Sequence, residues 1–168
     1  MIRLLITLSP FWVTILDVIG WTVISLAVGF YFFKKPDTRF SQEDWLTKER
    51  RFERKGDFYR KTLKIEAWKG YLPDGSKITK SGFRKKHLLN SRSDYLQKFV
   101  IESRRAEWTH FVALFAIPFF LVFNTGLDEL IVVVYGIVFN VPCALTQRYN
   151  RIRLLRVLRH RERACMRQ

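Results

Sequence analysis

The stretch "ESRRAEWTHFVALFAIPFF", residues 102–120, leads charged side chains directly into an apolar run. Charges beside a hydrocarbon layer are costly, so they usually pair with one another or serve a function. At about 100° per residue, a helix places Glu102, Glu107 and His110 on one face, together with Ser103 and Ala106. The stretch therefore predicts a helix that holds a polar cluster at the edge of an apolar segment.

The rest of the chain has the composition of a small membrane protein. Of its 168 residues 48% are hydrophobic, yet the formal net charge is +15. Apolar blocks alternate with basic ones, which is typical of helical membrane proteins and argues against a basic nucleic-acid-binding domain. A chain of this length forms a single domain, residues 1–168, without room for a separate catalytic domain.

The first apolar block, residues 11–33, contains a single charged residue, Asp17. A helix of this length spans about 34 Å, which is enough for a bilayer core. Ser9 and Pro10 mark its start, and Lys34 marks its end. A cleaved signal peptide is the competing interpretation, but the basic region that precedes such a segment is nearly absent.

The other two apolar blocks predict a transmembrane hairpin. Residues 104–123 form one arm, broken by Pro118, and residues 129–147 form the other. The sequence "NTGLDE" at 124–129 is a turn signal between them. In the basic tail, residues 148–168, leucines and arginines alternate at helical spacing, so the tail should continue the third helix along the membrane interface.

The distribution of basic residues predicts the orientation. Between Lys34 and Glu107 there are 21 Lys and Arg against 11 Asp and Glu, and after Leu145 there are eight Arg against one Glu. The positive-inside rule then places the N-terminus outside and residues 34–101 and the C-terminus in the cytoplasm. The predicted fold class is an all-α integral membrane protein: one N-terminal transmembrane helix, a cytoplasmic amphipathic and basic region, a transmembrane helical hairpin and a basic C-terminal interfacial helix.

The central region carries aromatic residues at a period of seven. Ser41 and Asp44 resemble a capping box, and Trp45, Phe52 and Tyr59 follow on a highly charged background. This pattern predicts an amphipathic helix that lies on the inner membrane surface. A helix that packs on the rest of the domain has the same period.

Two further features concern possible ligands. Arg84, Lys85 and Lys86 form a basic cluster that suits bound phosphates, although a solvated basic surface explains it as well. Cys143 and Cys165 lie in dissimilar surroundings without metal-binding spacing, so we expect neither a disulfide nor a metal site.

Folding the hairpin about residues 124–128 brings two polar clusters to one depth. Glu107 comes level with residues 146–148, and His110 comes level with residues 142–143. On the third helix, Gln147, Asn150 and Arg151 share one face. A structural ion-pair girdle between the two helices would account for four charged residues: Glu102, Arg104, Arg105 and Arg148.

The girdle does not account for His110, the deepest polar residue of the cluster. A histidine beside a glutamate at i−3 is a common general base for a hydroxyl nucleophile. We therefore expect His110 to take a proton while Glu107 holds the imidazole. The sequence has no G-x-S-x-G, HExxH or phosphate-loop motif that would point to other chemistry.

Four segments resemble one known family. They are "FERKGDFY" (52–59), "AWKGYLPDG" (67–75), "ESRRAEWTH" (102–110) and "NVPCALTQRYNRIRLLRVLRHRER" (140–163). In this order and spacing they resemble the glycosyl-4,4'-diaponeurosporenoate acyltransferases, small bacterial membrane enzymes of carotenoid biosynthesis. The resemblance covers about residues 40–163; the chain departs from the family in a longer N-terminal apolar run and in the turn at Pro73.

The resemblance implies an enzyme of the bacterial cell membrane that transfers a fatty acyl group to a sugar hydroxyl of a glycosylated carotenoid acid. Its partners would be this lipid-soluble acceptor, membrane lipid and an acyl donor, either acyl-CoA or acyl-carrier protein, with no cofactor and no nucleic acid. Two alternatives stay open: a non-enzymatic membrane adaptor that binds anionic lipid or a partner, and a membrane transferase with another lipid-linked acceptor.

From the residues themselves we assign three sets of expected roles. The catalytic residues are His110, Glu107 and Glu102. The residues expected to bind substrate, with the arginines of the third helix stabilising the oxyanion, are Arg105, Gln147, Arg148, Tyr149, Asn150 and Arg151. The residues expected to bind donor phosphates are Arg84, Lys85 and Lys86.

Overall fold

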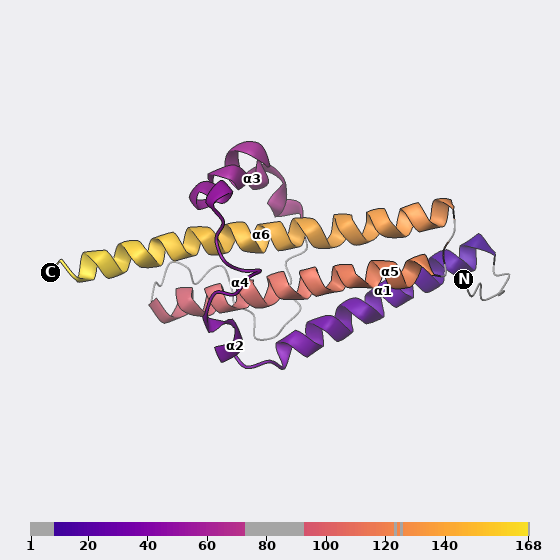
Figure 1. Cartoon of the computed structure of the whole chain (residues 1–168), viewed down its shortest axis with the longest axis horizontal. Coiled ribbons are helices and arrows are strands. Elements are labelled where there is room, and N and C mark those ends of the chain that lie inside the picture. The colour runs from indigo at the N-terminus through magenta and orange to yellow at the C-terminus, as the bar shows by residue number, and fades with distance from the viewer. Residues whose placement is uncertain (1–8, 73–92, 123, 125, 168) are drawn as a thin grey trace.

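The computed structural model describes residues 9–72, 93–122, 124 and 126–167. Within these residues every regular element is helical, which confirms the predicted all-α class (Figure 1). The turn at residues 73–75 and the basic cluster Arg84, Lys85 and Lys86 lie outside the described residues.

The first helix, α1 (Pro10–Phe33), begins and ends where the sequence predicted. Proline fits the first helical turn because its missing N–H has no partner there in any case. The carbonyl of Ser9 accepts the N–H groups of Trp12 and Val13 at 2.9 and 3.2 Å. Ser9 is the N-cap residue, as predicted, and its hydroxyl makes no capping hydrogen bond.

The hairpin consists of α4 (Ser93–Ala113), the 3-10 turn η6 (Leu114–Ala116), α5 (Ile117–Leu121) and α6 (Leu127–Cys165). The predicted break at Pro118 is confirmed, since the helix tightens into η6 just before this proline, which cannot donate a backbone hydrogen bond. At the tip, Gly126 has a φ of +67°, a conformation that glycine adopts without strain.

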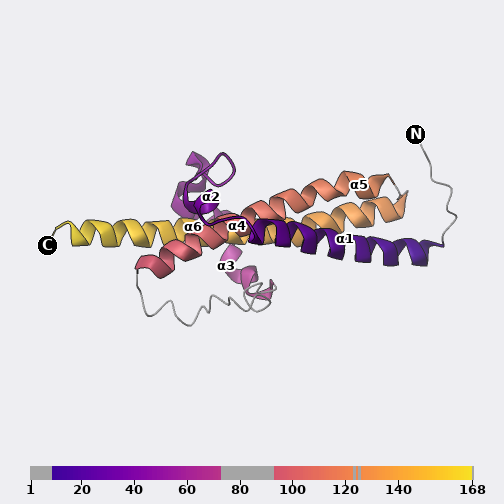
Figure 2. The same ribbon diagram turned by 90° about the horizontal axis from the view of Figure 1, so that it is seen from below.

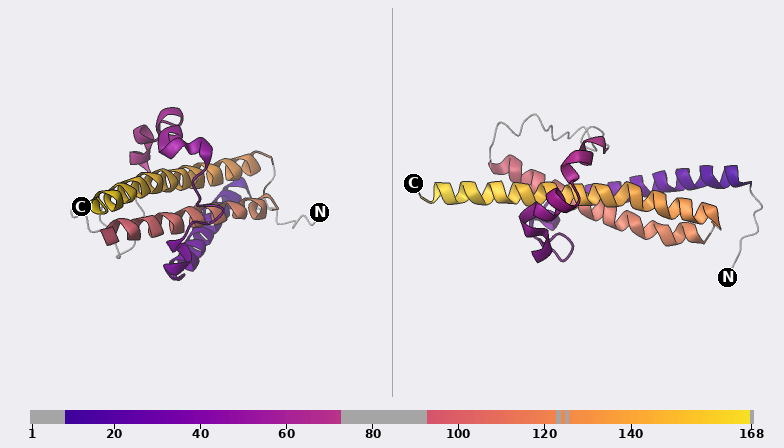
Figure 3. Two further views of the ribbon diagram at one scale, coloured as in Figure 1. Left: turned by 60° about the vertical axis from the view of Figure 1, so that its left-hand side comes forward. Right: turned by 90° about the horizontal axis from the view of Figure 1, so that it is seen from above.

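The third predicted span and the basic tail are one continuous helix. At 39 residues, α6 is about 58 Å long. It runs without a sharp bend, and its C-terminal end projects beyond the other helices (Figure 1, Figure 3). Continuity is confirmed, whereas the position of the tail along an interface stays a prediction.

By length and composition, two of the described helices are apolar enough to cross a membrane: α1 over Phe11–Phe33 and the apolar part of α6. The second predicted span, residues 104–123, is divided among α4, η6 and α5. Large apolar side chains of α1, such as Phe11, Leu26 and Phe30, are exposed on the protein surface.

Trp21 holds α1 against the hairpin. Figure 2 shows that α1 runs beside the hairpin. Its ring centroid lies 5.1 Å from that of Phe120 and 5.9 Å from that of Tyr135. Gly136 permits this approach, because a Cβ at that position would lie 2.6 Å from the indole. Any larger residue there would push α1 away from α6.

The predicted amphipathic helix after Ser41 is wrong. The segment contains short elements instead: α2 (Thr38–Ser41), η1 (Arg51–Gly56), η2 (Phe58–Thr62), α3 (Ile65–Trp68) and η3 (Lys69–Tyr71). Asp44 accepts the N–H groups of Leu46 and Thr47, and the positive φ angles of Arg54 and Lys55 reverse the chain. Both features are incompatible with a long helix.

The aromatic residues of this segment each have a separate partner. Trp45 packs edge-on against Trp108 of α4, with ring centroids 5.5 Å apart, while Tyr59 is buried with Tyr149 of α6. The segment thereby wraps around the hairpin, with α2 on one side of the α4–α6 pair and α3 on the other (Figure 1). It serves as a clasp around one end of the hairpin.

Candidate active site

An ion-pair network joins α4 to α6 at the level along the two helices that the sequence predicted. Glu107 accepts a hydrogen bond from Arg148 Nη1 at 2.7 Å with one carboxylate oxygen and one from Arg151 Nη1 with the other. Glu107 and Arg151 are buried, and only 1% of the Arg151 surface is exposed. The predicted juxtaposition of Glu107 and Arg148 is confirmed.

All five N–H donors of Arg148 are used within the protein. Two reach Glu53, one reaches Glu107, and two reach the carbonyls of Leu46 and Lys48. A guanidinium has five such donors, so none is left for a substrate or an oxyanion.

Arg151 also donates within the protein, since its second Nη donates to the carbonyl of Thr47 at 2.9 Å. Both arginines thus hold α4, α6 and the clasp together, and their expected contact with substrate stays a prediction.

Glu53 is a central member of the network that the sequence analysis missed. It is fully buried and accepts hydrogen bonds from Tyr59, from Arg148 and from the backbone N–H of Arg50. Burial opposes its ionisation, but the hydrogen bonds from these three residues outweigh burial and hold the pKa of Glu53 below its usual range. Burial and the bond to Glu53 raise the pKa of Tyr59, so the carboxylate is ionised and the phenol neutral at pH 7.

The remaining charges of α4 attach it to the chain that follows α1. Arg105 binds Glu102 at 2.8 Å and Asp37 at 2.6 Å. Arg104 donates to the carbonyls of Phe40 and Ser41 at 3.0 and 2.6 Å. Arg105, which we expected at the site, thus anchors the start of α2, whereas Glu102 pairs only within α4 among the described residues, with Lys98 and Arg105.

Three further residues with expected substrate contacts lie on α6. Tyr149 donates its hydroxyl to Glu66 at 2.6 Å and belongs to a buried cluster with Tyr59. The side-chain oxygen of Asn150 lies 3.5 Å from the Lys69 ammonium, and Gln147 is half-buried. The structure therefore does not gather them around His110.

His110 lies in a cleft, away from the ion-pair network. The expected contact with Glu107 is not formed; instead Nδ1 of His110 lies 3.2 Å from Oδ1 of Asn140 on α6. The cleft has a volume of about 200 Å³. It is lined by Trp21 and Ser25 of α1, Thr109, His110 and Ala113 of α4, and Tyr135, Phe139, Asn140 and Cys143 of α6.

Asn140 determines which nitrogen of His110 carries the proton. Its amide Nδ2 donates to the carbonyl of Gly136 at 2.9 Å, so its oxygen faces the imidazole and accepts the hydrogen of Nδ1. A neutral His110 therefore carries its proton on Nδ1 and presents Nε2 as a hydrogen-bond acceptor. This arrangement provides a general base next to a cleft.

Asn140 was missed because we searched for a charged partner of His110. The signal in the sequence was a lone asparagine within the apolar run "IVVVYGIVFNVPCAL", residues 131–145. Such a residue is costly in an apolar helix unless it has a partner. Asp37 and Asp44 were missed for a different reason. Asp37 pairs with Arg105, and Asp44 accepts from Trp108, and both partners lie far away in the sequence, on α4.

Among the residues that the structure describes, no group of three or more histidine, cysteine and acidic side chains is placed to hold a metal ion. The side chains that line the cleft include the imidazole of His110, a group that can transfer protons.

Comparison with known proteins places these residues in a family. Residues 42–160 match the family model described as "Glycosyl-4,4'-diaponeurosporenoate acyltransferase". Curated proteins of that name from Staphylococcus aureus strains bovine RF122 / ET3-1 and MRSA252 are 32% and 31% identical over 141 residues, which is 83% of this chain and 84% of theirs. No solved structure matches. The match covers the clasp, α4 and most of α6 with the His110–Asn140 pair, and the chain belongs to the glycosyl-4,4'-diaponeurosporenoate acyltransferase family.

Proposed function

We propose that the protein is a membrane acyltransferase of carotenoid biosynthesis. The names of its relatives indicate acyl transfer to a glycosylated carotenoid acid, and we infer that a fatty acyl group esterifies a hydroxyl of its sugar. The observation that carries the proposal is the His110–Asn140 pair at a cleft among apolar helices. A lipid-soluble acceptor reaches such a cleft from within the bilayer.

The proposed position in the membrane follows from the apolar and basic surfaces. α1 and the apolar part of α6 span the bilayer, because their large apolar side chains lie on the protein surface. The clasp and the basic end of α6 lie in the cytoplasm, and the N-terminus lies outside. This places the ion-pair network at the cytoplasmic boundary and the cleft just inside the hydrocarbon layer.

In the proposed reaction, Nε2 of His110 accepts the proton of the sugar hydroxyl as its oxygen attacks the carbonyl carbon of a fatty acyl thioester. The bond between carbon and sulfur then breaks, and the imidazolium returns the proton to the departing thiolate. The donor is an acyl-CoA or an acylated carrier protein that approaches from the cytoplasm, and no other cofactor enters the reaction.

Asn140 has the role that we first expected of Glu107. Its oxygen holds the Nδ1–H of His110, which fixes the tautomer and aims Nε2 into the cleft. Glu107, Arg148 and Arg151 support the site by holding α4, α6 and the clasp together, and Glu102 supports Arg105 within α4.

The test replaces His110 with glutamine and measures the acylated product by mass spectrometry in membranes supplied with a glycosylated carotenoid acid and a fatty acyl thioester. His110→Gln should lower turnover by about 10²–10⁴-fold. The parental rate should rise with pH through a single ionisation of the base, and this inflection should vanish in the variant.

His160→Gln is the matched control, since His160 is exposed on the distal part of α6 and should leave turnover unchanged. A folded His110→Gln protein with parental turnover would refute the catalytic assignment. If neither parent nor variants make any acylated product, the non-enzymatic adaptor becomes the better explanation.

A further inference from the structure

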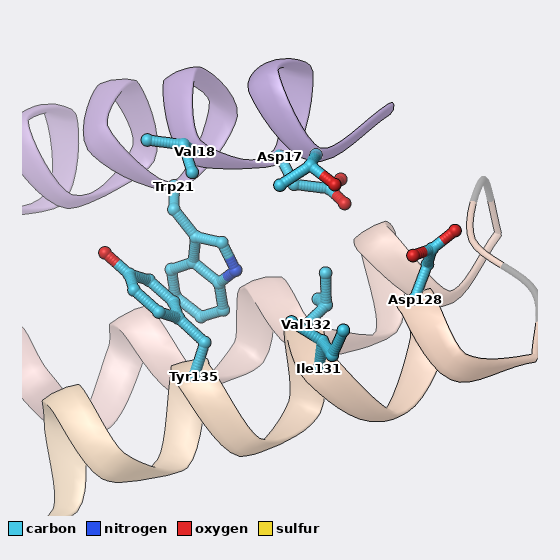
Figure 4. Close-up of a pocket in the computed structure, with 8 residues that line it drawn as sticks. Asp17, Val18, Trp21, Asp128, Ile131, Val132 and Tyr135 are labelled. Carbon is cyan, nitrogen blue, oxygen red and sulfur yellow. The ribbon is translucent and has the colours of Figure 1, made fainter. Parts of the chain in front are cut away.

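A second pocket lies on the other side of Trp21 from the His110 cleft. Tyr135 and Trp21 line both cavities, and the second one has a volume of about 50 Å³ between α1 and the first turns of α6. Its polar residues include Asp17 of α1 and Asp128 of α6 (Figure 4). Neither residue has a part in the proposed reaction.

The indole nitrogen of Trp21 adds a hydrogen-bond donor to the two carboxylates of this pocket. Trp21 is 3% exposed, and its N–H has no hydrogen-bond partner among the described residues. In Figure 4 this nitrogen and the Asp17 carboxylate both face the side where Asp128 stands. A buried N–H without a partner is costly, so a ligand that accepts from it gains by binding here.

An unpaired acceptor lies close to the same site. Asn124 is buried, and its Nδ2 donates to Asp17 at 3.0 Å. Its Oδ1 has no hydrogen-bond partner among the described residues. The pocket thus combines the Trp21 N–H, which has no partner among the described residues, with carboxylate acceptors on Asp17 and Asp128, and Asn124 adjoins it through Asp17.

This combination selects the chemistry of the ligand. A cation cannot accept from the Trp21 N–H, and an anion is repelled by the two carboxylates. A hydroxyl group both accepts and donates, and two neighbouring hydroxyls match the donor and the acceptors together. The volume has room for only a few non-hydrogen atoms, so it takes the end of a larger head group.

We propose that this pocket binds the terminal hydroxyls of a neutral polyol head group, a sugar or a glycerol, carried on an apolar chain in the bilayer. In the orientation given above the pocket lies near the outer surface, because Asp128 and Asn124 adjoin the hairpin tip. About 18 Å of α6 separates Asp128 from Asn140, so this site is distinct from the one that performs the acyl transfer.

The test measures the binding of three probes with equal alkyl chains to the full-length protein, by native mass spectrometry in an ether detergent that carries no sugar. The probes are dodecyl glucoside, monododecanoyl glycerol and dodecyl glucoside with all hydroxyls methylated. We expect the first, the second or both to bind, which identifies sugar or glycerol as the source, and the methylated probe to bind at least tenfold more weakly.

Asp128→Asn should weaken binding by about ten- to a hundredfold, because it replaces a charged acceptor. Glu129→Gln, an exposed neighbour outside the pocket, is the matched control and should bind as the parent does. Trp21→Phe, which keeps a ring but removes the N–H, provides a second measurement if Asp128→Asn does not fold.

Equal binding of the methylated probe, or Asp128→Asn and Trp21→Phe proteins that bind as tightly as the parent, would overturn the proposal. His110→Gln should bind the probes normally, so failure of the proposed reaction and failure of this site are distinguishable.

Discussion

Replacing Glu107 with glutamine tests whether the charged cluster supports the fold or performs the reaction. Glu107 is the only carboxylate that pairs with Arg151 among the described residues, whereas Arg148 also pairs with Glu53. Glu107→Gln therefore leaves Arg151, 1% exposed, as a buried charge without a counter-ion. Breaking a buried pair in this way costs about 3–5 kcal/mol in the free energy of unfolding.

The assay is unfolding in mixed detergent micelles, followed by loss of helical circular dichroism. The double variant Glu107→Gln/Arg151→Gln should be more stable than the sum of the two single effects predicts, with a coupling of about 1–3 kcal/mol, because it removes both charges. Glu102→Gln is the control. Glu102 is 35% exposed at its side chain, so its loss should cost less than about 1 kcal/mol.

The loss of stability at Glu102 is small also because Arg105 keeps Asp37 as a partner when Glu102 is replaced. The reasoning fails if Glu107→Gln is as stable as the parent and yet inactive. In that case Glu107 belongs to the reaction, and its bonds to the two arginines position it for chemistry.

Three further predictions use other parts of the molecule. The pKa of Glu53 is lowered in the folded state, so its stabilisation is present above its unfolded pKa of about 4.3 and is lost as the pH falls through the lower folded value. Thermal denaturation should thus show that the parent loses stability below about pH 4.5 more steeply than Glu53→Gln does. Cys143→Ser should keep near-parental turnover, since direct transfer needs no acyl-cysteine; a loss beyond about tenfold, with a stable acyl adduct on Cys143 in the parent, would contradict direct transfer. In a chain whose two native cysteines are replaced by serine, single cysteines at Glu129 and Arg163 should react with an impermeant thiol reagent from opposite sides of the membrane, because about 51 Å of α6 separates them.

The long helices were predictable because their signals are local. A run of apolar residues with Pro10 at its start fixes α1, and a turn at Gly126 fixes the level at which α4 faces α6. Counting outward from that turn was enough to bring Glu107 to Arg148. Counting residues from the turn is accurate only to about one helical turn. His110 therefore contacts Asn140, although residues 142–143 were expected at that level.

The clasp was not predictable from periodicity. Trp45, Phe52 and Tyr59 have a spacing of seven, but Trp45 and Tyr59 are positioned by contacts with α4 and α6 that no local pattern encodes. Phe52 packs against Phe58 of the same segment. Arg148 also binds backbone carbonyls of Leu46 and Lys48, and any residue type supplies such an acceptor. The partners of Arg148 and Arg151 could therefore not be predicted, because the segment that contains them has the sequence pattern of a charged surface.

The division between network and cleft follows from the cost of charge in an apolar environment. The carboxylates and guanidinium groups at one end of the hairpin form hydrogen bonds with each other. This pairing stabilises them and leaves few of their donors and acceptors for a substrate. Deeper in, His110 has an amide as its partner, so the resting site carries no formal charge there and avoids that desolvation cost. In the proposed reaction, charge develops on the imidazole only while a proton is in transfer. For that brief state the dipole of Asn140, already fixed by the carbonyl of Gly136, is aligned to stabilise it without reorganisation.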